Sequence, residues 1–253
     1  MSPDAGPALL AADLDGTVLD AAGVPAPGVV EALRDLAASG VLLVPCTGRP
    51  LQGAWQAMTA LAAAPAACVA YHGALVTDAT TGDWLRHLAL PPKVIARLAR
   101  RALGDGEKVT LYVGDERFDL GPGDAPETPA GSRGVTRLVI AGEPARVATS
   151  MELLDEARAC GLRLEPVRPG VVVVLPGAAD KGDGLRLAVA HLGADPSRVV
   201  ACGDATNDVS LLLAAAHGIA VGDAPEGLRR VAELTVPQDG LAGALRAVFA
   251  RLS

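Results

Sequence analysis

Aromatic residues are scarce in this sequence of 253 residues, since only 2% of them are Phe, Trp or Tyr. Half of the sequence is nevertheless hydrophobic, which allows a chain of this length to bury a core. That core must therefore be built from Ala, Val and Leu. The 29 glycines and 19 prolines divide the chain into many short elements, as is typical of an ordinary soluble globular protein.

Basic residues are also few relative to acidic ones, which gives a net charge of −7 and a pI of about 5.1. An extended nucleic-acid surface would show as a basic stripe, so we expect no nucleic-acid partner. The acidity does not exclude a small anionic ligand. Backbone N–H groups, one or two cationic side chains and a metal ion can bind a phosphate locally.

The four cysteines form no Cys-x-x-Cys pair, so the spacing of a cysteine metal site is absent. Cys46 and Cys202 lie in apolar runs, where Cys is usually a small buried hydrophobe. The N-terminus lacks the basic start and apolar stretch of a secretory signal. No run approaches the roughly 20 apolar residues of a membrane-spanning helix. We therefore expect a reduced, cytoplasmic protein with no membrane partner.

The first 78 residues predict a parallel sheet with helices on its faces. Apolar runs at 8–12, 41–46 and 66–71 predict strands, and the apolar periodicity of 27–39 and 50–63 predicts helices. Strands that alternate with helices in this way favour a parallel α/β arrangement.

The middle of the chain interrupts this alternation. It contains strand-like runs at 84–88, 109–112, 135–141 and 171–175, helical segments at 93–103 and 143–160, and a polar, Gly- and Pro-rich loop at 121–134. The alternation then resumes, with helices at 181–192, 208–215 and 241–252 and strands at 199–202 and 218–221. We therefore predict an α/β fold in which a doubly wound parallel-sheet core, residues 1–78 and 180–253, is interrupted by an inserted α+β cap, residues 79–179.

Two carboxylates follow the first predicted strand, in the motif Asp13-Leu14-Asp15-Gly16-Thr17. The carboxyl end of a parallel strand is where open α/β sheets bind ligands. Asp13 and Asp15 could face one pocket there, and Gly16 permits the turn that follows. Asp-Gly is also common in ordinary turns, so a simple turn remains the alternative for this motif alone.

Two weaker signals accompany it. Thr47, with Gly48 and Arg49, ends the second predicted strand, where its hydroxyl and nearby backbone N–H groups could bind phosphate oxygens. Lys181 opens a predicted helix, and its ammonium could neutralise a carboxylate and an incoming phosphate. Each feature alone is more often an ordinary strand–helix turn or a solvated lysine.

A second acidic motif, Gly-Asp-Ala-Thr-Asn-Asp at 203–208, follows another predicted strand. Asp204 and Asp208 add two carboxylates to Asp13 and Asp15, and four such acids would repel one another without a cation. Mg²⁺ takes oxygen ligands of this kind and often needs only one to three carboxylates. The alternative is a helix N-cap, which explains one acid but not the cluster.

These four motifs, in this order, resemble the haloacid dehalogenase superfamily over nearly the whole chain. The motifs at 13–17 and 203–208 are specific, whereas Thr47 and Lys181 are supportive. The long insertion resembles the α/β cap of the Cof-type branch, which includes many sugar-phosphate phosphatases and, more distantly, phosphomannomutases. The segment at 218–225 is also similar to that branch.

Two positions depart from the Cof-type pattern. His72 stands before Gly-Ala, where these proteins usually have Asn, and Asp223 stands before Ala-Pro, where they also usually have Asn. Neither change removes a catalytic group, but both could alter substrate contacts. His72 is expected near the junction of core and cap, either as a junction hydrogen-bonding residue or as a ligand-binding residue.

The resemblance implies a Mg²⁺-dependent phosphatase. By that resemblance, Asp13 attacks phosphorus and forms an aspartyl-phosphate, and Asp15 is the general acid and then the general base. The implied metal ligands are the Asp13 side chain, the Asp15 carbonyl and the Asp204 side chain, with Asp208 binding directly or through water.

The resemblance also implies how phosphate is bound. Thr47 and Lys181 would hold the transferring phosphoryl group. The remaining residues expected to contact phosphate or substrate are Gly16, Gly48, Arg49, His72 and Asn207. The cap would close over the leaving group and select a small phosphorylated metabolite, expected to be a sugar phosphate.

Three alternative functions remain at this point. A phosphomutase of the phosphomannomutase type would share the nucleophile and the cap. A phospho-receiver also phosphorylates an Asp on an open α/β sheet, but receivers are about half this length and lack a cap. A ligand-binding module would not need every group required for turnover. No motif identifies the substrate, and none indicates an oligomeric state.

Overall fold

The structure, a computed structural model, describes residues 6–121, 123–124, 133–143, 155 and 157–252. The chain forms two compact units. The core unit comprises Met1–Arg86 and Asp180–Ser253, and the inserted unit comprises His87–Ala179. From the sequence, the insertion is expected to begin at residue 79, whereas the second compact unit of the structure begins at His87.

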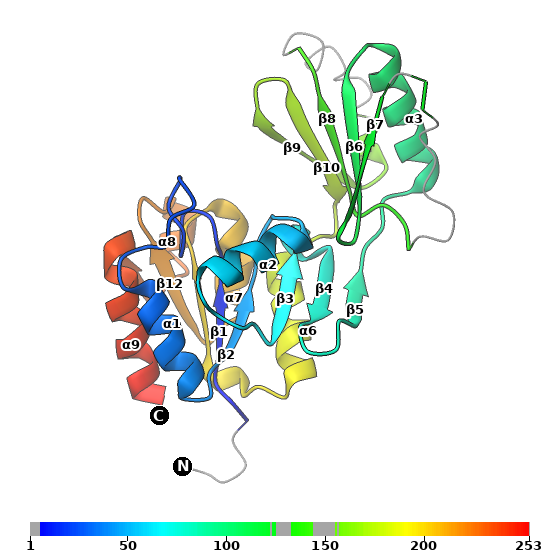
Figure 1. The fold of residues 1–253 in the computed structure, drawn as a ribbon. Helices are drawn as coiled ribbons and strands as arrows, with labels where there is room; N and C mark the ends of the chain where they lie inside the picture. Colours follow the sequence, from blue (N-terminus) through cyan, green and yellow to red (C-terminus); the bar gives the residue numbers. More distant parts are fainter. Residues whose placement is uncertain (1–5, 122, 125–132, 144–154, 156, 253) are drawn as a thin grey trace. The chain divides into compact units, whose positions relative to one another are not determined.

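A five-stranded parallel sheet forms the centre of the core unit (Figure 1). Its order is β13-β12-β11-β1-β2, and every neighbouring pair is parallel. The bounds are β1 (Leu9–Ala12), β2 (Leu42–Pro45), β11 (Val199–Gly203), β12 (His217–Val221) and β13 (Leu234–Val236). A bridge between Cys46 and Val69 joins β2 to β3 (Ala67–Ala70).

Helices cover both faces of this sheet. Their bounds are α1 (Val29–Ala38), α2 (Leu51–Ala60), α6 (Lys181–Leu192), α7 (Val209–Leu213), α8 (Glu226–Arg229) and α9 (Leu241–Leu252). Leu9 belongs to a core cluster with residues of α6 and α7. Its neighbour Leu10 lies instead with Leu33 of α1 and Met58 of α2. All four residues of β1 are buried, as expected for a parallel strand covered on both sides.

A three-stranded sheet, β3-β4-β5, completes the core unit, with β4 (Leu75–Asp78) antiparallel to β3 and followed by β5 (Trp84–His87). Tyr71 and His72 both adopt left-handed backbone conformations between β3 and β4. Short 3-10 turns occur at Tyr71–Gly73, Pro196–Arg198, Thr206–Asp208 and Gln238–Gly240.

The inserted unit contains a second five-stranded sheet, in the order β7-β6-β8-β10-β9. Its elements are α3 (Pro92–Gly104), β6 (Lys108–Val113), β7 (Glu116–Leu120), β8 (Arg137–Ala141), β9 (Leu162–Arg168) and β10 (Val171–Pro176). Leu98, Leu111 and Leu138 belong to its separate hydrophobic core. The helix expected at 143–160 and the loop expected at 121–134 fall mostly outside the described residues.

The strand directions bring the sequence motifs to one edge of the central sheet. Asp13 follows β1, Thr47 follows β2 and Asp204 follows β11. Because these strands are parallel and adjacent, their carboxyl ends meet at the edge where open α/β sheets bind ligands. Within the described part of the chain, no helix is long and apolar enough to cross a membrane. The predicted α/β class with a doubly wound core is confirmed.

Candidate active site

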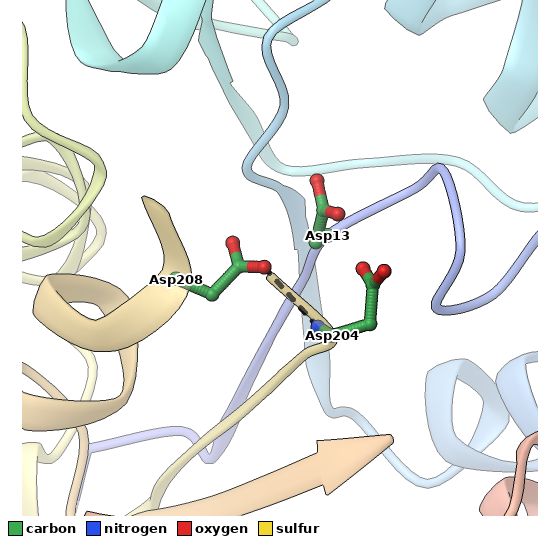
Figure 2. A group of neighbouring side chains, drawn as sticks. All are labelled: Asp13, Asp204 and Asp208. Atoms are coloured by element: carbon green, nitrogen blue, oxygen red, sulfur yellow. Dashed lines mark hydrogen bonds between the residues drawn. The ribbon is translucent and has the colours of Figure 1, made fainter. Parts of the chain in front are cut away.

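Three carboxylates converge at the carboxyl edge of the sheet (Figure 2). Asp13, Asp204 and Asp208 each offer an oxygen, and these oxygens lie within 4.8 Å of one another. The backbone N–H of Asp13 donates to the Cys202 carbonyl at 3.0 Å, which fixes the end of β1 beside the end of β11. The two acidic motifs therefore meet because their strands are neighbours.

Lys181 lies between two of these carboxylates. Its Nζ donates to Asp13 Oδ1 at 2.8 Å and to Asp208 Oδ1 at 2.6 Å. The side chains of Lys181 and Asp208 are only 1% and 0% exposed. A buried ammonium is tolerated only where opposite charges and hydrogen bonds compensate it. Lys181 is thus a buried ion-pair partner and not a solvated residue at a helix start.

Asp208 also holds the loop after β11. Its Oδ2 accepts the backbone N–H groups of Asp204, at 3.2 Å, and Ala205, at 3.0 Å. Figure 2 shows the first of these bonds. Both oxygens of Asp208 therefore already accept hydrogen bonds from protein donors, one from Lys181 and one from the loop that carries Asp204.

Burial determines the electrostatics of the cluster. It raises the pKa of Asp13 from 3.8 to about 7, although the Lys181 charge acts in the opposite direction. Burial also raises the pKa of Asp204. Burial alone would lower the pKa of Lys181, but Asp13 and Asp208 outweigh it and raise that pKa. Three carboxylates thus face one protein cation, and a further cation would favour their charged forms.

A close loop contact links the first and last motifs. Thr17 Oγ1 donates to Asp204 Oδ1 at 2.9 Å. Gly16 has φ +83°, and a Cβ at this position would lie 2.2 Å from Asp204 Oδ2. Only glycine both adopts this conformation readily and leaves room for the carboxylate. The Asp-Gly-Thr segment therefore does more than form a turn, because it brings Asp204 against the loop after Asp13.

Asp15 is exposed and pairs with Arg49. Arg49 Nε donates to Asp15 Oδ2 at 2.8 Å, and Arg49 Nη2 donates to Asp15 Oδ1. This pairing raises the pKa of Arg49. The backbone N–H of Arg49 donates to the buried Thr47 Oγ1 at 3.1 Å. The Thr47-Gly48-Arg49 segment is thereby joined to the Asp15 loop through a bidentate ion pair.

His72 connects the second motif to the fourth. Its backbone N–H donates to the Thr47 carbonyl at 2.9 Å, and Asn207 Nδ2 lies 3.3 Å from His72 Nδ1. A Cβ at Gly48 would lie 2.3 Å from His72 Nε2. The ring therefore contacts Gly48 and Asn207, which belong to two of the segments expected to bind phosphate.

The core unit thus contains every residue selected from the sequence as catalytic, metal-binding or phosphate-binding. The side chains of Thr17 and Gln238 also contact this group, although neither residue was assigned a role from the sequence. Thr17 was part of a motif but had no assigned role. Gln238 had no signal in the sequence, and its Nε2 lies within 3.2 Å of three carbonyl oxygens in the loop after Asp13.

Comparison with known proteins shows the family to which the chain belongs. A family model of haloacid dehalogenase-like hydrolases matches residues 10–127 and 124–245. A haloacid dehalogenase-like hydrolase from Bacteroides thetaiotaomicron has a similar crystal structure, with a TM-score of 0.83, 22% identity, and coverage of 96% of this chain and 100% of that one. A subclass IIB sugar phosphatase aligns with a TM-score of 0.72 and 18% identity over 95% of this chain and 98% of that one. At these identities the likeness shows the fold.

Curated relatives with higher identity match shorter stretches. Phosphoglycolate phosphatase of Methanopyrus kandleri is 41% identical over 75 residues, which are 29% of this chain and 32% of that protein. Chloroplastic endoribonuclease YBEY of Arabidopsis thaliana is 33% identical over 75 residues, 28% of this chain and 13% of that protein. The chain therefore spans about a third or less of the length of these two relatives.

Proposed function

The chain is an enzyme of the haloacid dehalogenase-like hydrolase family, and on that premise we propose that it hydrolyses a small phosphomonoester, a sugar phosphate, with Mg²⁺. The observation that carries the proposal is the buried ion pair of Lys181 with Asp13, beside Asp204 at the carboxyl edge of the sheet. A carboxylate nucleophile, a cation beside it and further metal-binding carboxylates are the groups that phosphoryl transfer through an enzyme aspartate requires.

Asp13 is the proposed nucleophile. One of its oxygens forms a bond to phosphorus while the ester P–O bond breaks, which gives an aspartyl-phosphate and a leaving alkoxide. The attack needs the ionised carboxylate, and the Lys181 charge favours that form of Asp13. Water then attacks the aspartyl-phosphate, releases inorganic phosphate and restores Asp13.

Asp15 is the proposed acid and base. It gives a proton to the leaving oxygen in the first step and takes one from the attacking water in the second. Arg49 contacts both carboxylate oxygens of Asp15, so this ion pair would open before Asp15 takes up and delivers a proton. Thr47, the Gly48 N–H and Lys181 would hold the phosphoryl oxygens, with Gly16, His72 and Asn207 beside them.

The acidic cluster fits Mg²⁺, because its donors are oxygens and its carboxylates outnumber the cations among them. The proposed ligands are the side chains of Asp13 and Asp204 and the carbonyl of Asp15. Asp208 already holds Lys181 and two backbone N–H groups, which supports a contact through water over a direct one. When bound, the ion would supply positive charge to the phosphate oxygens.

A panel of phosphorylated sugars and other phosphorylated metabolites tests the proposal, with phosphate release measured with Mg²⁺ and after chelation. We expect Mg²⁺-dependent release from at least one sugar phosphate, and full activity after chelation would contradict the metal assignment. Conversion of a sugar 1-phosphate to a 6-phosphate without phosphate release would instead indicate a mutase.

Asp13→Asn tests the nucleophile. An amide is a far poorer nucleophile than a carboxylate, so we expect phosphate release to be lost while the fold is retained, as measured by circular dichroism. Asp35→Asn makes the same change at an exposed residue of α1 and is expected to keep wild-type activity. Release by Asp13→Asn within about tenfold of wild type, or roughly 1.4 kcal/mol of barrier, would exclude Asp13 as the nucleophile.

A further inference from the structure

One side-chain nitrogen fills a cage of three backbone carbonyls beside the acidic cluster. Gln238 Nε2 lies 3.2 Å from the Gly16 oxygen, 3.1 Å from the Thr17 oxygen and 3.0 Å from the Leu19 oxygen. An amide nitrogen carries two hydrogens, so the three acceptors share two donors. Because all three neighbours are acceptors, the nitrogen of this amide and not its oxygen must face them.

The three carbonyls belong to the loop that carries Asp15. Within residues 14–19, the N–H of Gly16 donates to the Leu19 carbonyl and the N–H of Leu19 donates to the Leu14 carbonyl, both at 2.8 Å. This closed turn presents Asp15 on its exposed side. The Leu19 carbonyl thus has the Gly16 N–H as a partner besides Gln238. Thr17 is buried, so the loss of the Gln238 donor from its carbonyl would cost free energy.

Gln238 reaches this loop from a distant and firmly held part of the chain. It lies 222 residues from Gly16 in sequence and begins the 3-10 turn Gln238–Gly240, which leads directly into α9. Leu241 and Leu245 of α9 are fully buried, and α9 packs against α1. The amide is therefore held in a short turn directly before a buried helix of the core.

We propose that Gln238 is a positioning residue that fixes the 14–19 turn so that Asp15 meets the leaving oxygen of the substrate. The proposal rests on the function proposed above. Carbonyl oxygens that converge on one point repel one another unless a donor lies among them. Without that donor the carbonyls would move apart within the turn, although its two backbone hydrogen bonds remain, and Asp15 would shift even though its own side chain is unchanged.

This role predicts a dependence on the leaving group that a general loss of structure would not produce. An alkyl phosphate such as β-glycerol phosphate releases a strongly basic alkoxide, which needs a proton from Asp15. 2,4-Dinitrophenyl phosphate releases a weakly basic phenolate, which does not. A misplaced general acid therefore slows the first substrate much more than the second, whereas partial unfolding slows both equally.

The experiment measures kcat/KM for both substrates in full-length Gln238→Glu and Gln238→Lys. In Gln238→Glu the donor nitrogen is replaced by an oxygen that the carbonyls repel. In Gln238→Lys a donor nitrogen with three hydrogens is kept. General acid catalysis contributes about 10²–10⁴-fold, so we expect Gln238→Glu to lower the alkyl-to-aryl ratio by about 10- to 100-fold. Gln238→Lys should restore at least part of that ratio.

Gln56→Glu provides the matched control, because it makes the same change at an exposed position of α2 and should leave the ratio unchanged. Equal loss on both substrates in Gln238→Glu would overturn the proposal, as would an unchanged ratio in a folded variant. If the wild-type enzyme hydrolysed neither substrate nor any other phosphomonoester, the proposed function itself would fail, which is a different outcome.

Discussion

Protons and a metal ion compete for the Asp13 carboxylate. Burial raises its pKa in the folded protein from 3.8 to about 7, so the folded protein favours the protonated form below about pH 7. As the pH rises from about 4 to about 7, the unfolded chain loses this proton first, and the free energy of unfolding falls. A cation bound to the carboxylate would prevent this fall in the free energy of unfolding, because it stabilises the ionised form only in the folded state.

We therefore predict that Mg²⁺ affinity falls below about pH 7, by up to about tenfold per pH unit for the single proton on Asp13. Isothermal titration calorimetry at pH values from 5 to 8 would measure it. In Asp13→Asn the affinity should be weaker, and the part of its pH dependence that Asp13 causes should disappear. An affinity for the wild-type protein that is constant over this range would contradict the prediction.

At the scale of elements, the packing of α6 against β3 determines the position of Lys181. Gly184 is one turn into this helix, and a Cβ there would lie 2.5 Å from Val69 Cγ1 in β3. Val is β-branched and cannot turn away easily. The absence of a side chain at Gly184 therefore lets α6 pack closely against β3 and brings Lys181 to Asp13.

Because of this contact, we predict that Gly184→Ala destabilises the protein when residue 69 is Val and stabilises it when residue 69 is Ala. In the wild-type background the overlap should lower the free energy of unfolding by about 1–3 kcal/mol. In the Val69→Ala background the overlap is gone, and the better helix propensity of Ala should raise that free energy by up to about 1 kcal/mol. Urea denaturation of the four proteins measures both effects, and a loss of equal size in both backgrounds would show that Val69 is not the obstacle.

Local patterns predicted the elements of the core well. The predicted helices at 181–192 and 241–252 have the observed bounds. For α6 the reason is visible, because Asp180 caps its start with a bond to the Asp183 N–H and Gly193 ends it in a left-handed conformation. Such signals lie next to each other in the sequence, so no tertiary contact is needed to recognise them.

Strands β4 and β9 were not predicted, although each pairs with a strand adjacent to it in the sequence. β4 was missed because the turn before it uses Tyr71 and His72 in left-handed conformations, where glycine or asparagine is the usual signal. β9 was missed because Glu165, Pro166 and Arg168 interrupt its apolar pattern, and its order depends on pairing with β10. Here the tertiary context outweighs local propensity.

The site shows the same contrast between features with a local sequence signal and features without one. The spacing of Asp13, Asp15, Asp204 and Lys181 was enough to predict the haloacid dehalogenase-like family, which is confirmed. The contacts of Arg49 with Asp15 and of Gln238 with the 14–19 turn join segments 34 to 222 residues apart. No local pattern predicts them, because they arise only when the sheet brings those segments together.

At the scale of the whole molecule, the two units have separate hydrophobic cores. Leu9, Val69 and Leu185 belong to one cluster in the core unit, and Leu98 and Leu138 belong to another in the inserted unit. All proposed Mg²⁺ ligands lie in the core unit. A ligand that binds only the folded form of one unit stabilises that unit by mass action, and its effect reaches the other unit only if the two unfold together.

Hydrogen exchange with and without Mg²⁺ would therefore separate the two units. At about 100 times the dissociation constant, Mg²⁺ should add roughly 2.7 kcal/mol to the unfolding free energy of the core unit. Amides of β1 and β11 that exchange through its global unfolding should then slow by about 100-fold, since each 1.4 kcal/mol is a factor of ten. Amides of β6 and β8 in the inserted unit should exchange at unchanged rates.

The variant Asp13→Asn serves as the control, because it keeps both cores and removes one proposed ligand, so Mg²⁺ should slow its β1 and β11 amides much less. Equal slowing of β6 and β8 in the wild-type protein would mean that the two units unfold as one, despite their separate cores. Slowing confined to β6 and β8 would contradict the metal site itself, because none of the residues proposed to bind Mg²⁺ lies between His87 and Ala179.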